Sequence, residues 1–421
     1  MKPLTKLITF GIVTRLIYYL WMIISSHILP SYDLQTLLLG ENVSPYLSPF
    51  ASWDGVHFLS IAKDGYIHEH QHCFFPLYPY LIRLLSFSSD NINLYILNGI
   101  IVSFISFMVS LIVIYQLTKE LIGEQFAFKT GIIFCFAPAS VFMTSVYTES
   151  FYGCLSLLAC YYLLQKHNIL LSCVFFALSS FVRSNGLINM GFVLYYFVDS
   201  VIPFATFPQF KQRPTLKLLI NCVLLTISNL GPFVLYVYTA SKPFCALNPL
   251  PSYCEKSFPN VYSYNQGRYW NQGFMKYWRV EEIPNFLLCA PCCIISLLIG
   301  CIYLKNYLMR HPFLYTLLRF KPSENIQINQ LNDKKEPKEF MKQNHALVFV
   351  VHLLAFIIIG LFCFHAQTLT RFVSACPAFY WGIVWITEQK SFGILRFAVL
   401  FYCLFFTFFG ELMFASFYPW T

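Results

Sequence analysis

Long apolar stretches alternate with short polar ones along most of the 421-residue chain. A helix that crosses a membrane needs about 20 mostly apolar residues, within a range of about 17–25. By this measure the pattern predicts eleven spans, at residues 7–28, 92–117, 127–144, 147–165, 168–184, 187–203, 217–239, 285–304, 345–364, 370–387 and 395–415. The stretch 74–88 is shorter and contains two prolines, which predicts an interfacial or re-entrant piece instead.

The composition agrees with this pattern. Hydrophobic residues make up 57% of the chain and charged residues 11%, whereas soluble domains carry about 25% charged residues. The first span is too long for the apolar part of a signal peptide, and no small-residue cleavage site follows it, so we expect a retained anchor. The sequence therefore predicts an all-α polytopic membrane protein with one integral-membrane domain over residues 1–421.

The positive charges predict the orientation of the spans. With the N-terminus in the cytoplasm, 18 Lys and Arg residues fall on the cytoplasmic side and nine on the other, which is the bias that cytoplasmic loops show. This distribution explains the net charge of +9 without a nucleic-acid partner. Two long loops, 30–91 and 240–284, then lie across the membrane; their many aromatic residues and prolines predict folded pieces on the membrane surface. The loop 305–344 is cytoplasmic, and its polar part, 321–344, predicts a flexible linker.

The fifteen cysteines do not predict a disulfide scaffold or a metal site. Most of them lie inside apolar stretches, where a cysteine is usually a small buried apolar residue. A bridge between Cys245 and Cys254, in the second long loop, stays open. No cysteine and histidine spacing is typical of a zinc site.

Unusual polar residues gather on one side of the membrane in this topology. They come from the first long loop, the turn after the third span, the end of the fifth span, the second long loop and the turn after the ninth span. Such a polar face, backed by an apolar bundle, suits a lipid-linked substrate. The candidates are Trp53, Asp54, His57 and Asp64; Glu149; Arg183 and Asn185; Arg268, Tyr269, Trp270 and Lys276; and His365, Gln367 and Arg371.

Each candidate also has a simpler interpretation. Tryptophan and tyrosine are common in interfacial aromatic belts, and Arg183 at a span end suits an arginine that reaches toward headgroups. Asp54 and Asp64 each precede a glycine, so either suits a turn or a helix cap. Only the gathering of all these residues on one side favours a site.

Sugar transfer from a lipid phosphate would use this set of residues well. The leaving phosphate needs no strong acid, but the accepting hydroxyl needs a base, for which we take Asp54. His57, Arg268, Lys276 or Arg371 would hold the phosphate, and Trp53, Tyr269 and Trp270 would contact sugar or lipid. A transporter of lipid-linked glycans without catalysis is the alternative. The position of the candidates in long loops, and the absence of an internal sequence repeat, favour the enzyme.

Several motifs spread over nearly the whole chain resemble the PIG-V family. In order, they are WDGVHFLSIAKDGY with EH after it, FFPLYP, APASVF with YTES after it, FVRSNGL, CEKSFPNVYSYNQGRYWNQGFMKY, IPNFLLCAP, HAQTLTRF and the terminal PWT. The resemblance implies a GT-C type glycosyltransferase of the endoplasmic reticulum membrane, with its site on the lumenal side.

The reaction implied by the resemblance is the second mannose transfer of glycosylphosphatidylinositol (GPI) anchor synthesis. Mannose would pass from dolichyl-phosphate mannose to the 6-hydroxyl of the first mannose of the GPI precursor, with inversion, and with no cofactor or metal. The resemblance points to Asp54 as the base, with Asp64 second. Another lipid-linked acceptor and the need for a small accessory membrane subunit stay open. Asn42, in an N-glycosylation triplet followed by Pro45, serves as a test of topology.

Overall fold

The computed structural model describes residues 2–33, 38–40, 42–201, 214–311 and 339–420. In these ranges the chain forms helices and turns, and no strand. The α-helices are α1 (Pro3–Ile28), α2 (Asp54–Asp64), α3 (Leu77–Leu85), α4 (Ile92–Leu121), α5 (Glu124–Cys135), α6 (Ser140–Thr144), α7 (Glu149–Leu164), α8 (Ile169–Val182), α9 (Met190–Val201), α10 (Leu216–Ser241), α11 (Val261–Tyr269), α12 (Ile283–Arg310), α14 (Leu347–Cys363), α15 (Thr368–Val373), α16 (Pro377–Glu388) and α17 (Leu395–Ala415).

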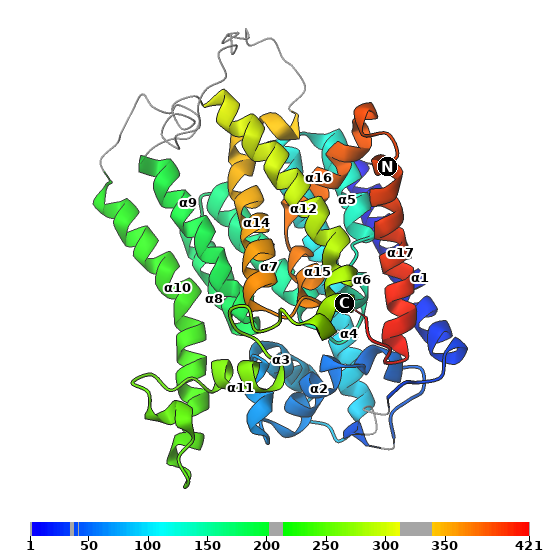
Figure 1. The fold of residues 1–421 in the computed structure, drawn as a ribbon, viewed down its shortest axis with the longest axis vertical. Coiled ribbons are helices and arrows are strands. Elements are labelled where there is room, and N and C mark those ends of the chain that lie inside the picture. Colours follow the sequence, from blue (N-terminus) through cyan, green and yellow to red (C-terminus); the bar gives the residue numbers. More distant parts are fainter. Residues whose placement is uncertain (1, 34–37, 41, 202–213, 312–338, 421) are drawn as a thin grey trace.

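The long helices run side by side in one bundle (Figure 1). Six of them, α1, α4, α10, α12, α14 and α17, are long and apolar enough to cross a membrane. The prediction of an all-α multi-pass membrane protein is confirmed. All eleven predicted stretches contain helix, but several helices are shorter than a full span, so the number eleven stays a prediction.

Two of the predicted spans are interrupted, and a third irregular turn lies between two spans. The stretch 127–144 divides into α5 and α6 around Pro138, and 370–387 divides into α15 and α16, with Pro377 at the first position of α16. Proline has no N–H to donate and its ring blocks the preceding turn, so a helix ends before it. The short 3-10 helix η4 (Ser184–Asn189) likewise separates α8 from α9. Irregular backbone at membrane depth is tolerated where protein buries it or where it lines a cavity.

Arg15 of α1 forms hydrogen bonds with residues on both sides of the break between α5 and α6. Its guanidinium donates to the carbonyl oxygen of Cys135 at 2.8 Å, to Ser140 Oγ at 2.8 Å and to Thr144 Oγ1 at 3.1 Å. The side chain is fully buried and lies 4.0 Å from the centre of the Phe107 ring. The last carbonyls of α5, which lack partners within the helix, are thus bound by a neighbouring helix.

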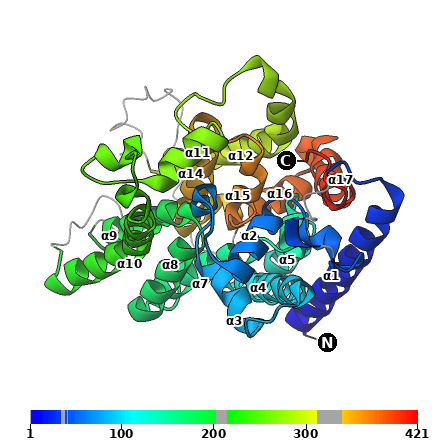
Figure 2. The same cartoon turned by 90° about the horizontal axis from the view of Figure 1, so that it is seen from below.

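A layer of short helices covers one end of the bundle. Helices α2, α3 and α11 lie across the ends of the long helices (Figure 1). Viewed from that end, α2 lies near the middle of the molecule, with α1 and α10 toward opposite edges (Figure 2). These helices belong to the two long loops, 30–91 and 240–284, which contain several short helices in their described residues. Cys245 and Cys254 form a disulfide in the second loop.

The predicted cytoplasmic loop 305–344 is described only in part. Helix α12 continues to Arg310, six residues beyond the predicted end of its span, and short 3-10 turns form at Phe340–Lys342 and Asn344–Ala346. Most of the predicted flexible linker 321–344 lies outside the described residues.

Candidate active site

A cavity of about 510 Å³ lies where the covering layer meets the bundle. All five segments that supply the predicted polar residues contribute to its wall, although the turn after the third span contributes Tyr147 and Thr148 and not Glu149. The candidates that line it are Trp53, Asp54, Arg183, Asn185, Trp270, His365, Gln367 and Arg371. Residues that are far apart in the sequence therefore meet in one site, as the predicted topology requires.

Asp54 is held at the wall of this cavity by its backbone. It is the first residue of α2, where the helix dipole favours a negative charge. Its N–H donates to the hydroxyl of Tyr147 at 2.9 Å. The preceding residue, Trp53, has φ 57° and ψ −128°, a strained conformation for a residue with a side chain. This sharp turn starts α2 at Asp54, whose side chain remains 27% exposed.

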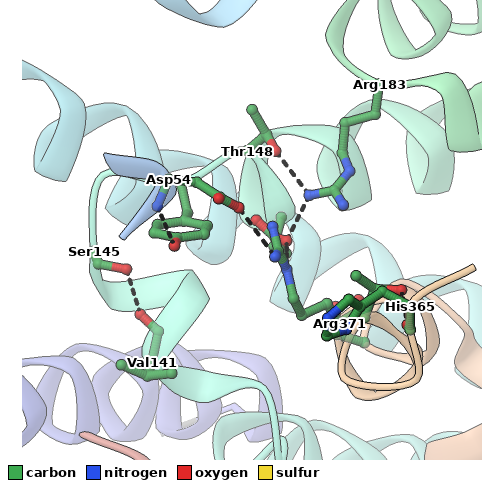
Figure 3. Close-up of polar contacts among 11 residues, drawn as sticks. Asp54, Val141, Ser145, Thr148, Arg183, His365 and Arg371 are labelled. Atoms are coloured by element: carbon green, nitrogen blue, oxygen red, sulfur yellow. Dashed lines mark hydrogen bonds and ion pairs between the residues drawn. The ribbon is translucent and has the colours of Figure 1, made fainter. Parts of the chain in front are cut away.

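Two arginines, Arg183 and Arg371, and two carboxylates, Asp54 and Glu149, form a connected network (Figure 3). Arg371 Nη1 lies 3.1 Å from Asp54 Oδ2, and Arg371 Nε lies 2.5 Å from Glu149 Oε1. Arg183 Nη1 donates to the same oxygen of Glu149 at 2.5 Å and to Thr148 Oγ1 at 2.8 Å. Glu149 therefore holds both guanidinium groups in fixed positions.

The network has a buried side and an open side. The side chain of Glu149 is 2% exposed, and the residue is not part of the cavity wall. The side chains of Arg183 and Arg371 are 14% and 13% exposed, and both line the cavity. Guanidinium groups carry five N–H donors in a planar fork that matches phosphate oxygens. The arrangement therefore presents two cations to an anion in the cavity and holds them from behind.

Neutral polar groups form a second wall. Asn285 Nδ2 donates to the Tyr277 hydroxyl at 2.7 Å, and that hydroxyl lies 2.9 Å from His365 Nε2. Gln367 Nε2 donates to Asn285 Oδ1 at 2.7 Å. Burial lowers the pKa of His365 to about 4, with the positive charge of Arg371 acting in the same direction. A neutral imidazole can accept the Tyr277 proton at Nε2, so the chain of hydrogen bonds is satisfied.

The chain is similar to known mannosyltransferases over nearly its full length. A family model described as Mannosyltransferase (PIG-V) matches residues 4–421. The chain belongs to this family of mannosyltransferases.

Relatives in animals cover most of the chain. The human protein named GPI alpha-1,6-mannosyltransferase 2 is 29% identical over 372 residues, which are 80% of this chain and 73% of that protein. GPI mannosyltransferase 2 of Drosophila melanogaster is 25% identical over 100% of both chains. Among solved structures, ArnT from Cupriavidus metallidurans bound to undecaprenyl phosphate is 12% identical and covers 94% of this chain and 64% of that chain, with a TM-score of 0.48.

Six of the candidates in this family member lie outside the cavity wall. Glu149 lies behind the two arginines, and Asp64 is exposed at the opposite end of α2, about 15 Å of helix rise from Asp54. The other four are His57, Arg268, Tyr269 and Lys276. Of the two carboxylates considered for the base, only Asp54 therefore has access to the cavity.

Several residues of the wall are not among the candidates that the sequence pattern predicts. Asn285 and Gln272 supply amides, and Tyr262, Phe414 and Trp420 supply rings. Asn285 lies in the motif IPNFLLCAP and Trp420 in the terminal PWT, so the motifs that resemble the family contained the signal. Gln272 also lies in such a motif, among many other polar residues, and nothing local distinguishes it.

Proposed function

We propose that this chain is an α-1,6-mannosyltransferase that moves mannose from dolichyl-phosphate mannose to the GPI-anchor precursor. The observation that carries the proposal is the cavity in which Asp54 faces Arg183 and Arg371. Among the described residues that line it, Asp54 is the one carboxylate. The names of the human and Drosophila relatives support the choice of donor sugar, linkage and acceptor.

The chemistry follows from the position of these groups. Asp54 takes the proton of the accepting sugar hydroxyl while its oxygen bonds to the anomeric carbon of the donor mannose. The bond from that carbon to the phosphate oxygen breaks, and the phosphate keeps the electron pair. Arg183 and Arg371 stabilise the charge that develops on the phosphate. One displacement inverts the anomeric carbon, so a β-linked donor gives an α-linked product.

The fixed arginines favour this step over simple binding. Glu149 and Thr148 hold Arg183, and Glu149 and Asp54 hold Arg371, so neither guanidinium needs to reorganise as charge develops. Donors that are placed in advance stabilise a transition state more than groups that must first move. The leaving group is already a phosphate, so the proposal needs neither a metal ion nor a cofactor.

We place the cavity on the lumenal side of the endoplasmic reticulum membrane. Two observations support this. The distribution of Lys and Arg favours it, and the Cys245–Cys254 disulfide lies in the loop that covers the cavity. Disulfides persist in the oxidising lumen and are rare in the cytosol.

Glycosylation of Asn42 tests this orientation. Asn42 is exposed in the first long loop, but the following Pro45 disfavours modification of its triplet. A Pro45→Ala variant should gain a glycan that glycosidase removes, and the added change Asn42→Gln should abolish it. If a triplet engineered into residues 321–344 is modified instead, the orientation is reversed.

The proposed reaction is tested with the purified protein in detergent. The wild type should transfer mannose from dolichyl-phosphate mannose to the mannosylated GPI precursor. An α-1,6-specific mannosidase should then release the added mannose from the product. Asp54→Asn keeps the shape of the side chain and should lower turnover by about 10²–10⁴-fold. The matched variant Asp64→Asn should stay near the wild type.

Each alternative predicts a different result. Near-normal turnover of Asp54→Asn would show that the base is another group. Transfer to a different lipid-linked glycan, with none to the GPI precursor, would change the acceptor. No transfer in detergent by the folded wild type would favour the glycan transporter, because no transmembrane movement takes place there.

A further inference from the structure

A continuous row of rings leads from the cavity to the surface of the covering layer. Phe74 and Trp270 line the cavity, with their ring centres 6.0 Å apart. His57 stacks on Phe74 at 5.0 Å, and the edge of His70 meets His57 at 5.4 Å. His68 then stacks on His70 at 5.5 Å, with 9° between the planes.

Tyr269 contacts two rings of this row, so the rings form a continuous patch and not a single line. Its ring centre lies 5.8 Å from that of His70 and 5.9 Å from that of Trp270. We call Phe74, Trp270, His57, His70, His68 and Tyr269 the ring shelf. The shelf joins the first long loop to α11, and its inner end is part of the cavity wall.

The outer part of the ring shelf is open to solvent. Tyr269 is 49% exposed, and His68 is also exposed. The shelf lies in the covering layer formed by α2, α11 and the 3-10 helix η3 (Glu69–Cys73), which packs against α11. Rings that served only to fill a core would be enclosed, so the exposed faces are available to a ligand.

The backbone that carries these exposed rings is fixed. Gln71 Oε1 accepts hydrogen bonds from the N–H groups of Ile67 at 2.8 Å and of His68 at 2.9 Å. Its amide nitrogen donates to Ser60 Oγ at 3.1 Å. From the other side, Tyr253 donates to Glu69 Oε1 at 2.8 Å. A surface that is ordered before binding loses less entropy when a ligand binds.

The rings present flat and largely uncharged faces. Burial lowers the pKa of His57 and of His70, and neighbouring histidines act in the same direction. Both imidazoles are therefore neutral near pH 7. In the described part of the chain, no group of three or more His, Cys, Asp or Glu side chains is placed to hold a metal ion. Exposed Arg268, 5.7 Å from the centre of the Tyr269 ring, adds hydrogen-bond donors at the edge.

We propose that the ring shelf is a saccharide-binding subsite that holds sugars of the acceptor beyond the one that accepts mannose. Flat neutral rings take the C–H face of a sugar ring, and a guanidinium at the edge donates to its hydroxyls. The donor carries one sugar, which must lie between Asp54 and the arginines for the reaction. Only the acceptor has further sugars to lie outside the cavity, so this inference rests on the proposed function.

The test compares two acceptors in detergent. One is the mannosylated GPI precursor, and the other is an alkyl mannoside that carries only the accepting sugar. In His70→Ala and Tyr269→Ala, the KM for the precursor should rise about tenfold, which corresponds to the loss of one stacking contact of about 1.4 kcal/mol. The KM for the mannoside, the KM for the donor and kcat should stay at wild-type values.

Two further variants control the test. His70→Phe keeps a flat ring and should retain the wild-type KM for the precursor. Tyr46→Ala removes a tyrosine that is 63% exposed in the same loop and lies next to a histidine, His27, but is not part of the ring shelf. It should leave every constant unchanged.

The results separate the subsite from the activity. An unchanged precursor KM in both alanine variants would overturn the ring shelf as a subsite. An equal loss with precursor and mannoside would also overturn it, because damage to the cavity would then explain the loss. If the wild type transferred to neither acceptor, the proposed function itself would fail.

Discussion

Arg371 and Arg15 both place a guanidinium group inside an apolar helix bundle, but they bind different partners. Arg371 forms ion pairs with two carboxylates, Asp54 and Glu149, and lines a cavity. Arg15 donates to a carbonyl and two hydroxyls at the break between α5 and α6, and is fully enclosed. Its charge also acts on Glu411 of α17, which is fully buried.

The difference indicates which buried charge takes part in binding. An arginine at a cavity wall can add a ligand anion to the partners it already has. Arg15 is fully buried and is not among the residues that line the described cavity, and its donors bind the ends of neighbouring helices. Residue type and burial are nearly the same in both places, so access to a cavity separates the two roles.

Among the variants that test this comparison, Arg371→Met should have the largest effect, and the effect should be on catalysis. The change removes a donor from the phosphate and leaves Asp54 without its ion pair, so we expect kcat/KM to fall by about 10²–10³-fold or more. Arg371→Lys keeps the charge but loses the planar fork, and should give an intermediate loss. Turnover within tenfold of the wild type for Arg371→Met would remove the arginine from the mechanism.

Arg15→Met should affect stability and leave the chemistry alone. The carbonyl of Cys135 and the hydroxyls of Ser140 and Thr144 would lose the donor that Arg15 supplies, so we expect a loss of about 1–3 kcal/mol in the free energy of unfolding. The kcat/KM of the folded enzyme should stay within about threefold of the wild type. Thermal inactivation in detergent, with active-site titration, measures the two separately.

Adding Glu411→Leu to that variant sharpens the comparison. Both carboxylate oxygens of Glu411 are buried without a hydrogen-bond partner among the described residues, so an apolar side chain at this position removes a buried polar group that costs stability. The double variant should therefore regain stability over Arg15→Met. If Arg15→Met were instead stable but inactive, the two arginines would not differ in the way described.

Acid should weaken the second wall of the cavity by a smaller amount. Burial lowers the pKa of His365 to about 4 from an ordinary value of 6.5. Between these pH values the unfolded chain binds a proton that the folded one does not, so stability falls as the pH drops from 6.5 toward 4. The shift corresponds to at most about 3 kcal/mol.

A matched variant isolates this contribution. Burial also lowers the pKa of His72 to about 4, so that residue adds a similar slope. His365→Gln should reduce the dependence of stability on pH between 6.5 and 4, and the slope that remains comes from the other histidines whose pKa burial lowers, among them His72, His57 and His70. Denaturation at a series of pH values measures both slopes. The same slope in the variant and the wild type would show that His365 is not buried as a neutral group.

Gln367→Leu should have the smallest effect. It removes one hydrogen bond between neutral groups, to Asn285 Oδ1. We expect a loss of about 1 kcal/mol in stability and less than a tenfold change in kcat/KM. A loss as large as that of Arg371→Met would show that the neutral wall contacts the reacting groups directly.

Local patterns in the sequence were sufficient for the all-α multi-pass architecture, and they singled out Asp54 as the candidate base. An apolar stretch long enough to cross a membrane is a property of neighbouring residues, so the helices appeared where the pattern predicted them. Asp54 was singled out because it follows Trp53 in a motif within a loop rich in titratable groups. Helix breaks at Pro138 and Pro377 also have local causes, although the pattern alone extended the spans across them.

The roles of the other polar residues depended on packing between distant segments. Arg268 and Lys276 have the same chemistry as Arg183, but only Arg183 lies at the cavity wall, because α8 ends there. Glu149 looked like a substrate contact until the structure placed it behind two arginines.

By itself, then, the sequence determined the class of protein, the positions of its long apolar helices and the stretch that carries the candidate base. The tertiary structure decided which charges share a cavity, which are enclosed like Arg15, and which rings join into a shelf. The physical reason is the sequence separation over which each interaction acts. Hydropathy and proline breaks act over a few residues, whereas ion pairs such as Asp54 with Arg371 join positions 317 residues apart and exist only once the helices have packed.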